Sequence, residues 1–273
     1  MLVRLKADTT PLMSRHWAAV LVFVAAAAAC ASAQRQEVLV SAAASLADVM
    51  TQVARAYESR SGVRVTVNTG ASNTLARQII AGASVDVFIS ADETQMDSVR
   101  GEIVPGTRVD LLSNQLAIAV AADRPRTMRT ARDLIDPAIK RIGMGDSTAV
   151  PAGVYAKAYL EKLGIWNQIS ARVVPSASVR VALASVENGA ADVAIVYKTD
   201  IASARRATLA LAIPVSEGPR IVYPAAILRG GRHRDAAVRF LSWLRDAEAS
   251  AIFRAAGFIR LVREPATIGR DRC

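Results

Sequence analysis

The sequence has few of the residues on which catalytic and metal-binding sites depend. Among its 273 residues there are two cysteines, Cys30 and Cys273, and two histidines, His16 and His233. A zinc site needs a cluster of His or Cys ligands. A Ser-His-Asp triad needs a histidine beside an activated serine, and no nucleophile-elbow motif is present. Phosphate-binding glycine motifs are also absent. These absences argue against a metalloenzyme, a serine hydrolase and a nucleotide-binding protein, and they predict that the protein is not an enzyme.

Basic residues outnumber acidic ones, 34 against 24, which gives a formal net charge of +10. They are scattered, without a run of Lys or Arg and without interleaved aromatic side chains, so the sequence predicts no nucleic-acid partner. A basic surface can steer an anion toward the protein. An arginine-rich genome is the simpler explanation of the same composition.

The first 33 residues have the features of a secretory signal peptide. Three basic residues precede an uncharged apolar run at 20–29, which is too short to be a comfortable membrane span. Ala-Ser-Ala at 31–33 fits a cleavage site, with Gln34 as the first mature residue. The segment therefore predicts export to the periplasm. An uncleaved anchor is the alternative.

Both cysteines lie outside the part of the chain that is expected to fold. Cys30 is within the signal segment, where a lipid anchor is a further alternative, although alanines rather than a leucine-led lipobox precede it. Cys273 ends a polar tail at 263–273. Cleavage would leave a single cysteine, so no intramolecular disulfide is expected. The core must then hold the fold, which a composition of 52% hydrophobic residues allows.

Segments typical of strands alternate with helical patterns along the chain. β-branched or alternating residues predict strands, and a helical hydrophobic period, which in four cases ends at a glycine, predicts each helix. The predicted strands are 37–40, 63–67, 85–89, 116–120, 141–144, 172–174, 191–197 and 221–228, and the predicted helices are 46–57, 75–80, 151–163, 179–186, 236–244 and 247–256. Such βαβ order indicates an α/β fold with parallel strands and helices on the sheet faces. We expect two lobes.

Four predicted helix starts resemble one another: SLAD at 45–48, SNTL at 72–75, PAGV at 151–154 and SVRV at 178–181. A helix N-terminus presents unpaired N–H groups and a partial positive charge. Several such ends can bind an anion without a charged side chain. Because ligands of open α/β sheets bind beyond the carboxyl ends of strands, we predict an anion site where these helices begin.

Single residues near this site have simpler interpretations as well. Ser45 and Ser72 are also suited to be N-caps, a common role of serine. Asp86 and Asp92 flank a predicted strand end, where carboxylates more often cap helices or brace a hinge than form a catalytic pair. His233 lies between two arginines and is expected to be exposed at a helix start.

Five ordered motifs resemble those of the periplasmic molybdate-binding proteins of ABC importers. They are AAASL at 42–46, ASNTLARQI at 71–79, DVFISAD at 86–92, VPAGVYAK at 150–157 and AIVY at 194–197. They occur in the family's order, and the resemblance covers residues 37–260, nearly the whole mature chain. The resemblance implies the bilobal periplasmic binding protein fold of type II, with mixed, mostly parallel sheets and a ligand cleft between the lobes. Lobe 1 would comprise 34–115 and 225–262, and lobe 2 would comprise 116–224.

The resemblance also implies which residues hold the oxyanion. Ser45 and Ser72 would supply hydroxyl and amide donors from the first lobe, Ala152 and Val179 backbone amides from the second, and Tyr197 its phenol. No residue would be catalytic, none would ligate the metal directly, and no cofactor would be needed besides the bound molybdate or tungstate. The partner would be the membrane permease of an ABC transporter, and the receptor would be a monomer. Lys198 departs from the family pattern, in which a small residue is expected after the tyrosine.

A site of this kind would hold only hydrogen-bond donors. Molybdate and tungstate are fully deprotonated at neutral pH, and a hydrogen bond to a charged acceptor contributes about 1.5–3 kcal/mol. Hydrogen phosphate keeps a proton and needs an acceptor, so such a site disfavours it. Sulfate has the same charge and shape as molybdate, and a sulfate or thiosulfate receptor is the main alternative. A secreted hydrolase using Ser45 or Ser72 is a second alternative. The effector domain of a transcription regulator is a third, but it would need a DNA-binding helix-turn-helix where the signal segment lies.

Overall fold

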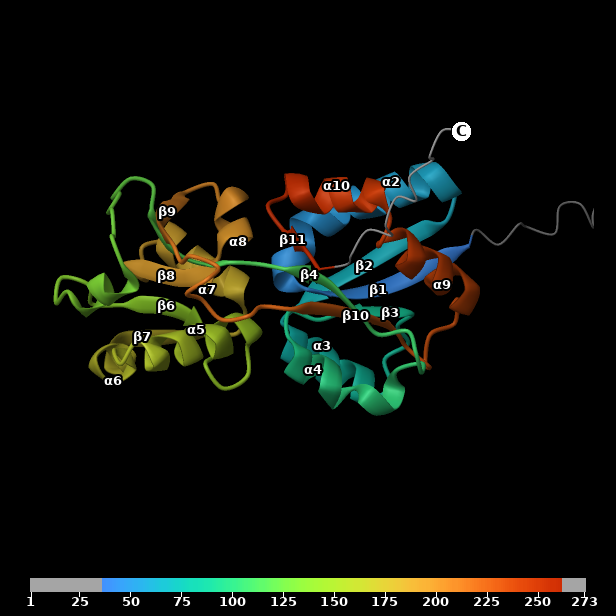
Figure 1. Ribbon diagram of the computed structural model, residues 1–273, viewed down its shortest axis with the longest axis horizontal. Coiled ribbons are helices and arrows are strands. Elements are labelled where there is room, and N and C mark those ends of the chain that lie inside the picture. Colours follow the sequence, from blue (N-terminus) through green and yellow to red (C-terminus); the bar gives the residue numbers. More distant parts are fainter. Residues whose placement is uncertain (1–35, 262–273) are drawn as a thin grey trace, which may run out of the picture. The chain divides into compact units, whose positions relative to one another are not determined.

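The computed structural model describes residues 36–261 of the chain. The predicted signal peptide at 1–33, Cys30, and the tail at 263–273 with Cys273 lie outside the described residues. Two β-sheets with flanking helices make up the described part, as Figure 1 shows.

Six strands form the first sheet, in the order β11-β4-β10-β3-β1-β2. β1 pairs in parallel with β2 and β3, as the βαβαβ pattern predicts. β10 pairs antiparallel with β3 and β4, and β11 pairs antiparallel with β4, so the sheet is mixed. The bounds are β1 Glu37–Ala43, β2 Arg64–Gly70, β3 Val87–Ile89, β4 Val109–Ser113, β10 Tyr223–Ile227 and β11 Ile259–Arg260.

Helices cover both faces of this sheet (Figure 1). Successive side chains of a strand point to opposite faces, which is visible in β3. Val87 and Ile89 belong to the main core, whereas Phe88 between them packs with Leu75 and Met96 in a second core beneath α3 and α4. The helices of this part are η1 Ala44–Leu46, α2 Ala47–Ser61, α3 Ser72–Ile80, α4 Glu93–Ser98, η2 Arg100–Glu102, α9 Arg234–Trp243 and α10 Ala247–Ala255.

Five strands form the second sheet, in the order β7-β6-β8-β5-β9. β6 pairs in parallel with β7 and β8, and β5 pairs antiparallel with β8 and β9. The strands are β5 Leu116–Ala121, β6 Ile142–Gly145, β7 Val173–Ser176, β8 Val193–Tyr197 and β9 Ala207–Ala212. The helices are η3 Ala131–Ile135, α5 Pro151–Lys162, α6 Trp166–Ile169, η4 Ser170–Arg172, α7 Val179–Glu187 and α8 Lys198–Ala202. α5 and α7 both contact β6 and β8.

The chain passes from the first sheet to the second and back again. Asn114 and Gln115 connect β4 to β5, and residues 213–222 lead from β9 back to β10. Both ends of the described chain therefore contribute strands to the first sheet. The predicted lobe limit at 225 lies within β10, and the lobe limits remain a prediction.

Three strands and three α-helices were not expected from the sequence pattern. β4 carries the charged Asp110 as its second residue, β9 is rich in alanine and leucine, and β11 has only two residues. α4, α6 and α8 have six, four and five residues. Helices this short do not reveal a hydrophobic period, so the sequence offers little evidence of them.

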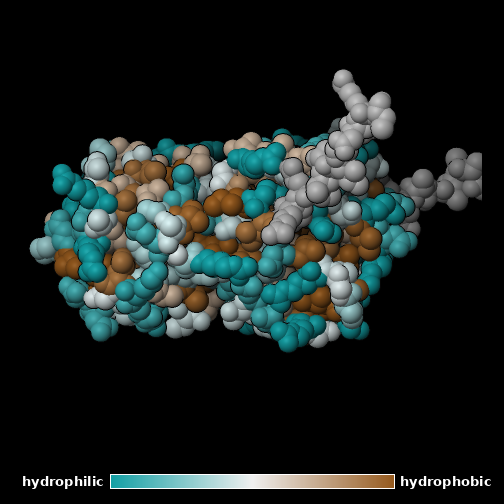
Figure 2. All heavy atoms as spheres, viewed as in Figure 1, coloured by the Kyte–Doolittle hydropathy of each residue, from teal (hydrophilic) through white to brown (hydrophobic). Residues whose placement is uncertain are grey.

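On the face drawn in Figure 2, hydrophilic and apolar residues are interspersed. Large apolar side chains that are exposed, such as Ile80 and Val181, come from different helices. Exposed apolar residues scattered in this way are normal on folded proteins. Within residues 36–261, no helix combines the length and apolar character needed to cross a membrane.

Candidate oxyanion site

The predicted site residues meet around one small cavity. Ser45, Ser72, Ala152, Val179 and Tyr197 all line it, and every other lining residue is alanine, valine or proline. The lining comes from elements of both sheets. The space open to a water-sized sphere is about 10 Å³, on the order of one water molecule. The cavity therefore lacks charged side chains and leaves little free space.

Helix N-termini supply much of the cavity wall. Ser72 begins α3, Val179 begins α7, and Ala152 is the second residue of α5, after Pro151. The first N–H groups of a helix have no partner within that helix, and they carry its positive dipole end. Proline suits the first position because its missing N–H would be unpaired there anyway. The backbone around the cavity is therefore rich in donors for an anion.

A glycine lets α5 begin close to the second sheet. A Cβ atom added to Gly153 would collide with the backbone carbonyls of Gly145 and Asp146. Gly145 ends β6, so this close approach places the start of α5 at the carboxyl end of that strand. The PAG sequence at 151–153 thus combines a helix-starting proline with a glycine, the one residue without a Cβ, at the point where α5 comes close to the end of β6.

Ser45 lies inside the short helix η1, where 3% of its surface is exposed. Its hydroxyl oxygen lies 3.0 Å from the phenol oxygen of Tyr223. The N-cap of η1 is Ala43, and no side chain caps it. The interpretation of Ser45 as a simple N-cap is therefore wrong.

Ser72 is also buried and also not a cap, since Ala71 occupies the N-cap position of α3. Its hydroxyl oxygen accepts a hydrogen bond of 2.9 Å from the N–H of Ala91. The hydroxyl proton takes no part in that bond and remains available at the cavity. Ser178, by contrast, is the N-cap of α7, and its oxygen accepts from the N–H of Val181 at 3.3 Å.

Tyr197 ends β8 with its side chain at the cavity wall. The residue is 1% exposed, yet within the described chain its phenol oxygen has no hydrogen-bond partner. Burial, reinforced by the neighbouring Tyr223, raises the pKa of this phenol well above its usual value, so it keeps its proton. Because most buried polar groups are hydrogen-bonded, an unpaired donor here indicates a place for a ligand.

Three polar residues that the sequence did not single out form a buried hydrogen-bond network next to Ser45, and Tyr223 is the one that contacts Ser45. The Asn114 side-chain nitrogen donates to the hydroxyl of Thr199 at 2.8 Å and to the phenol of Tyr223 at 3.2 Å. All three are buried. Asn114 belongs to the first connection, Thr199 to α8 and Tyr223 to β10, so no sequence spacing could have linked them.

The buried carboxylate of Asp200, close to Tyr197 along the chain, is already paired. Asp200 is completely buried, and one of its carboxylate oxygens lies 2.9 Å from Nε of Arg180. Burial raises the pKa of Asp200 to about 6, against the opposing effect of Arg180. Arg180 also donates to the carboxylate of Asp48 at 2.7 Å and to Ser203 at 2.9 Å. Since Asp48 lies on α2 and Arg180 on α7, this ion pair connects helices that pack on different sheets.

The other residues considered from the sequence have structural roles. Buried Asp86 accepts from the backbone N–H of His233 at 2.8 Å and lies 2.9 Å from its ring Nδ1. His233 is thus half-buried and bonded rather than exposed as expected. Asp92 is the N-cap of α4 and accepts from the N–H of Gln95 at 2.9 Å. Lys198 is exposed and is not among the cavity residues.

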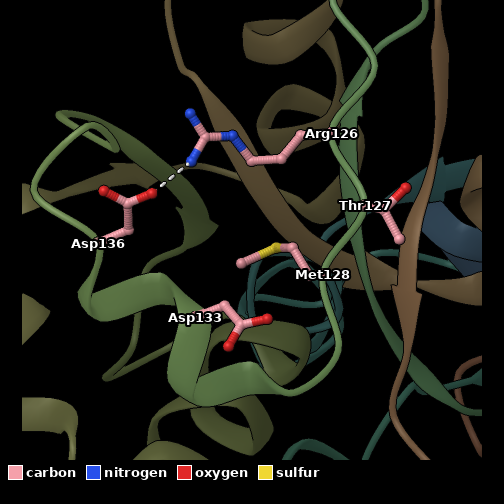
Figure 3. A pocket seen from close by; sticks show the side chains of 5 residues that line it. All are labelled: Arg126, Thr127, Met128, Asp133 and Asp136. Atoms are coloured by element: carbon pink, nitrogen blue, oxygen red, sulfur yellow. Dashed lines mark hydrogen bonds and ion pairs between the residues drawn. The ribbon is translucent and has the colours of Figure 1, made fainter.

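A second hollow is lined by Arg126, Thr127, Met128, Asp133 and Asp136 (Figure 3). Asp136 pairs with Arg126 at 3.0 Å, and Asp133 accepts from the N–H of Arg129 at 2.7 Å. Two carboxylates would oppose an anion, and both already have partners. Within residues 36–261, no group of three or more His, Cys, Asp or Glu side chains is placed to hold a metal ion.

Comparison with known proteins places this geometry in a family. A family model described as bacterial extracellular solute-binding protein matches residues 38–259, a range that includes all the cavity residues. The chain belongs to this family. This solute-binding protein is 35% identical to the molybdate-binding protein ModA of Escherichia coli over 260 residues, which cover 90% of the chain and 99% of ModA. The predicted resemblance and the predicted bilobal α/β fold are both confirmed.

Solved structures of related receptors have the same fold. The periplasmic molybdate-binding protein of Azotobacter vinelandii aligns with a TM-score of 0.73 at 26% identity, covering 82% of this chain and 98% of that one. The sulfate-binding protein SubI of Mycobacterium tuberculosis also gives 0.73, at 19% identity, covering 83% and 87%. The fold alone therefore does not distinguish between anions, whereas the greater sequence identity lies with the molybdate receptors.

Proposed function

We propose that this solute-binding protein binds molybdate, and also tungstate, outside the cytoplasmic membrane and delivers it to the permease of an ABC transporter. The observation that carries the proposal is the cavity itself. Five residues from both sheets converge on it, no charged side chain lines it, and one of its phenols is unpaired. Sequence identity to ModA supports the choice of anion. The protein acts as a receptor and not as an enzyme.

In this proposal each cavity residue donates to an oxygen of the anion. Ser45 and Ser72 supply hydroxyl protons, since their oxygens already face Tyr223 and the N–H of Ala91. Ala152 and Val179 supply backbone N–H groups at helix N-termini. Tyr197 supplies its phenol proton, since the phenol oxygen has no hydrogen-bond partner within the described chain. Hydrogen bonds to a charged acceptor contribute about 1.5–3 kcal/mol each, so several of them offset the loss of hydration.

The donor set also determines which anions are rejected. A fully deprotonated tetrahedral dianion accepts from every donor, whereas hydrogen phosphate brings a proton for which the lining offers no carboxylate. That proton would face another donor. Sulfate has no proton and is rejected only by size, because its bonds are shorter than those of molybdate.

Release and delivery of the anion require the two sheets, each with its own helices, to move apart. The cavity has room for about one water molecule, less than a tetrahedral oxyanion occupies, and its wall comes from elements of both sheets, so binding also requires these elements to separate. Hinge closure of two lobes around a ligand is an established type of motion, and the two connections between the sheets are its natural hinges. The receptor would act as a monomer in the periplasm, exported by the signal peptide at 1–33, with a lipid anchor at Cys30 as the alternative.

Isothermal titration of the mature chain with molybdate, sulfate and phosphate tests the proposal. We expect tight one-to-one binding of molybdate and a much weaker response to sulfate and phosphate. Sulfate binding as tight as molybdate would change the function to that of a sulfate receptor. No response to any of the three anions would refute the receptor function, and turnover of a generic ester would then support the hydrolase alternative.

A further inference from the structure

The hydrogen-bond chain behind Ser45 has a direction that the surrounding atoms determine. The side-chain oxygen of Asn114 accepts from the backbone N–H of Gln115 at 2.8 Å. An amide can be turned in either sense only when its surroundings allow both, and this N–H requires the oxygen on its side. The nitrogen of Asn114 therefore faces Thr199 and Tyr223, and it can only donate.

The hydrogen bond between Tyr223 and Ser45 has a direction that the single phenol proton of Tyr223 determines. The phenol oxygen of Tyr223 accepts from Asn114 at 3.2 Å and has one proton of its own to donate. Burial raises the pKa of this phenol, so the proton stays in place. Within the described chain, Ser45 is the other hydrogen-bond partner of this oxygen, at 3.0 Å. A buried phenol proton needs an acceptor, and Asn114 offers only donors, so Tyr223 donates its proton to the oxygen of Ser45.

The serine proton is left for the cavity. Because the oxygen of Ser45 accepts from Tyr223, its own proton points elsewhere, and Ser45 lines the cavity wall. Ser72 reaches the same state differently, since its oxygen accepts from the N–H of Ala91. Both serines are therefore held as donors toward the same space.

We propose that Asn114 and Tyr223 are positioning residues that hold Ser45 as a donor and so make the cavity reject oxyanions that carry a proton. This inference rests on the proposed function. Neither residue lines the cavity, and both act through Ser45. Without them the serine hydroxyl can rotate and offer its lone pairs, which would accept the proton of hydrogen phosphate.

The test is a nearly isosteric change, Asn114→Asp, which reverses the direction of the hydrogen bonds from residue 114 through Tyr223 to Ser45. A carboxylate at this position still accepts from the N–H of Gln115, but it also accepts from Tyr223. The phenol oxygen then accepts from Ser45, and the serine turns a lone pair toward the cavity. Tyr223→Phe removes the link altogether. Thr199→Val is the matched control, because it removes a partner of Asn114 that does not lead to Ser45.

The measurement is the ratio of the affinities for molybdate and hydrogen phosphate, by competition titration at mildly alkaline pH. Both anions are dianions there, so the repulsion from the new carboxylate cancels in the ratio. We expect the ratio to fall at least about tenfold in Asn114→Asp and by a smaller factor in Tyr223→Phe, and to stay unchanged in Thr199→Val.

The outcomes separate this inference from the proposed function. If the wild-type protein binds no molybdate, the proposed function fails. If the wild type binds molybdate but phosphate competes no better in either folded variant than in the wild type, the positioning inference is overturned. Should Asn114→Asp fail to fold, Tyr223→Phe decides alone, because it removes a single oxygen from a buried ring.

Discussion

Replacing Tyr197 with phenylalanine should change ligand affinity and the stability of the free protein in opposite directions. The phenol oxygen is buried, protonated and without a partner in the described chain. A buried polar group left without a hydrogen bond costs about 1–3 kcal/mol. Removing it relieves that cost in the free protein. The free variant should therefore be as stable as the wild type or more so.

Anion binding should respond in the other direction. The lost bond to a dianion is worth about 1.5–3 kcal/mol, and each 1.4 kcal/mol is a factor of ten. The Kd for molybdate should rise by roughly 10–150-fold. In a domain of this size, 1 kcal/mol corresponds to about 2–4 °C in Tm, so the free variant should melt no lower than the wild type and up to several degrees higher.

Two assays on one preparation check this reasoning. Titration calorimetry with molybdate gives the Kd, and thermal unfolding without ligand gives the Tm. A variant that melts well below the wild type and binds molybdate with unchanged affinity would refute it, because Tyr197 would then be a structural residue with a hidden partner.

Other perturbations follow from the same contacts. Ser45→Ala and Ser72→Ala should each raise the Kd for molybdate by roughly 10-fold or more, measured by calorimetry, because each removes a donor to a charged acceptor; unchanged affinity would contradict the site. The folded pKa of Asp200 is raised to about 6 from 3.8, so the native state holds the extra proton between these values, and stability should fall as pH rises from about 4 to about 6, by on the order of 3 kcal/mol. Denaturant unfolding across this range should show the slope in the wild type and lose it in Asp200→Asn; equal slopes would contradict the prediction. Gly153→Ala should lower the Tm by several degrees, because its Cβ would collide with the carbonyl of Gly145; an unchanged Tm would show that α5 can shift without cost.

The sequence predicted those elements whose own pattern is strong. The apolar run at 191–197 contains β8, and the alternating residues at 63–67 overlap the first part of β2. β9 was missed because ATLALA at 207–212 is rich in helix-forming alanine and leucine, and pairing with β5 overrides that preference. Local pattern therefore determines the strands with β-branched or alternating runs, whereas tertiary pairing determines those, such as β9, whose residues do not favour a strand.

The convergence of the cavity residues was predictable, but what lies behind them was not. The helix starts at 72, 151 and 179 can be read locally from Ser72, Pro151 and Ser178 near strand ends. The choice of Ala152 and Val179 as donors came from the family resemblance, because neither residue has a polar side chain. Ser45 is held through Tyr223 and Asn114, and Asn114 also contacts Thr199; these three residues are separated by long stretches of chain. Nothing near any of these three residues indicates the other two, so only the fold reveals the direction of the hydrogen bonds.

The alternation of the chain between the sheets has a consequence for the order of assembly. The second sheet is made from one continuous stretch, 116–212, whereas the first needs β10 and β11 from the far end of the described chain. Closing a long loop costs more entropy than closing a short one. A newly synthesised chain, which emerges N-terminus first, can therefore complete the second sheet while β3 and β4 still lack the strand between them. Until β10 arrives, those two strands have unpaired edges that can bind other chains, and this interval is when the new chain is most exposed to aggregation.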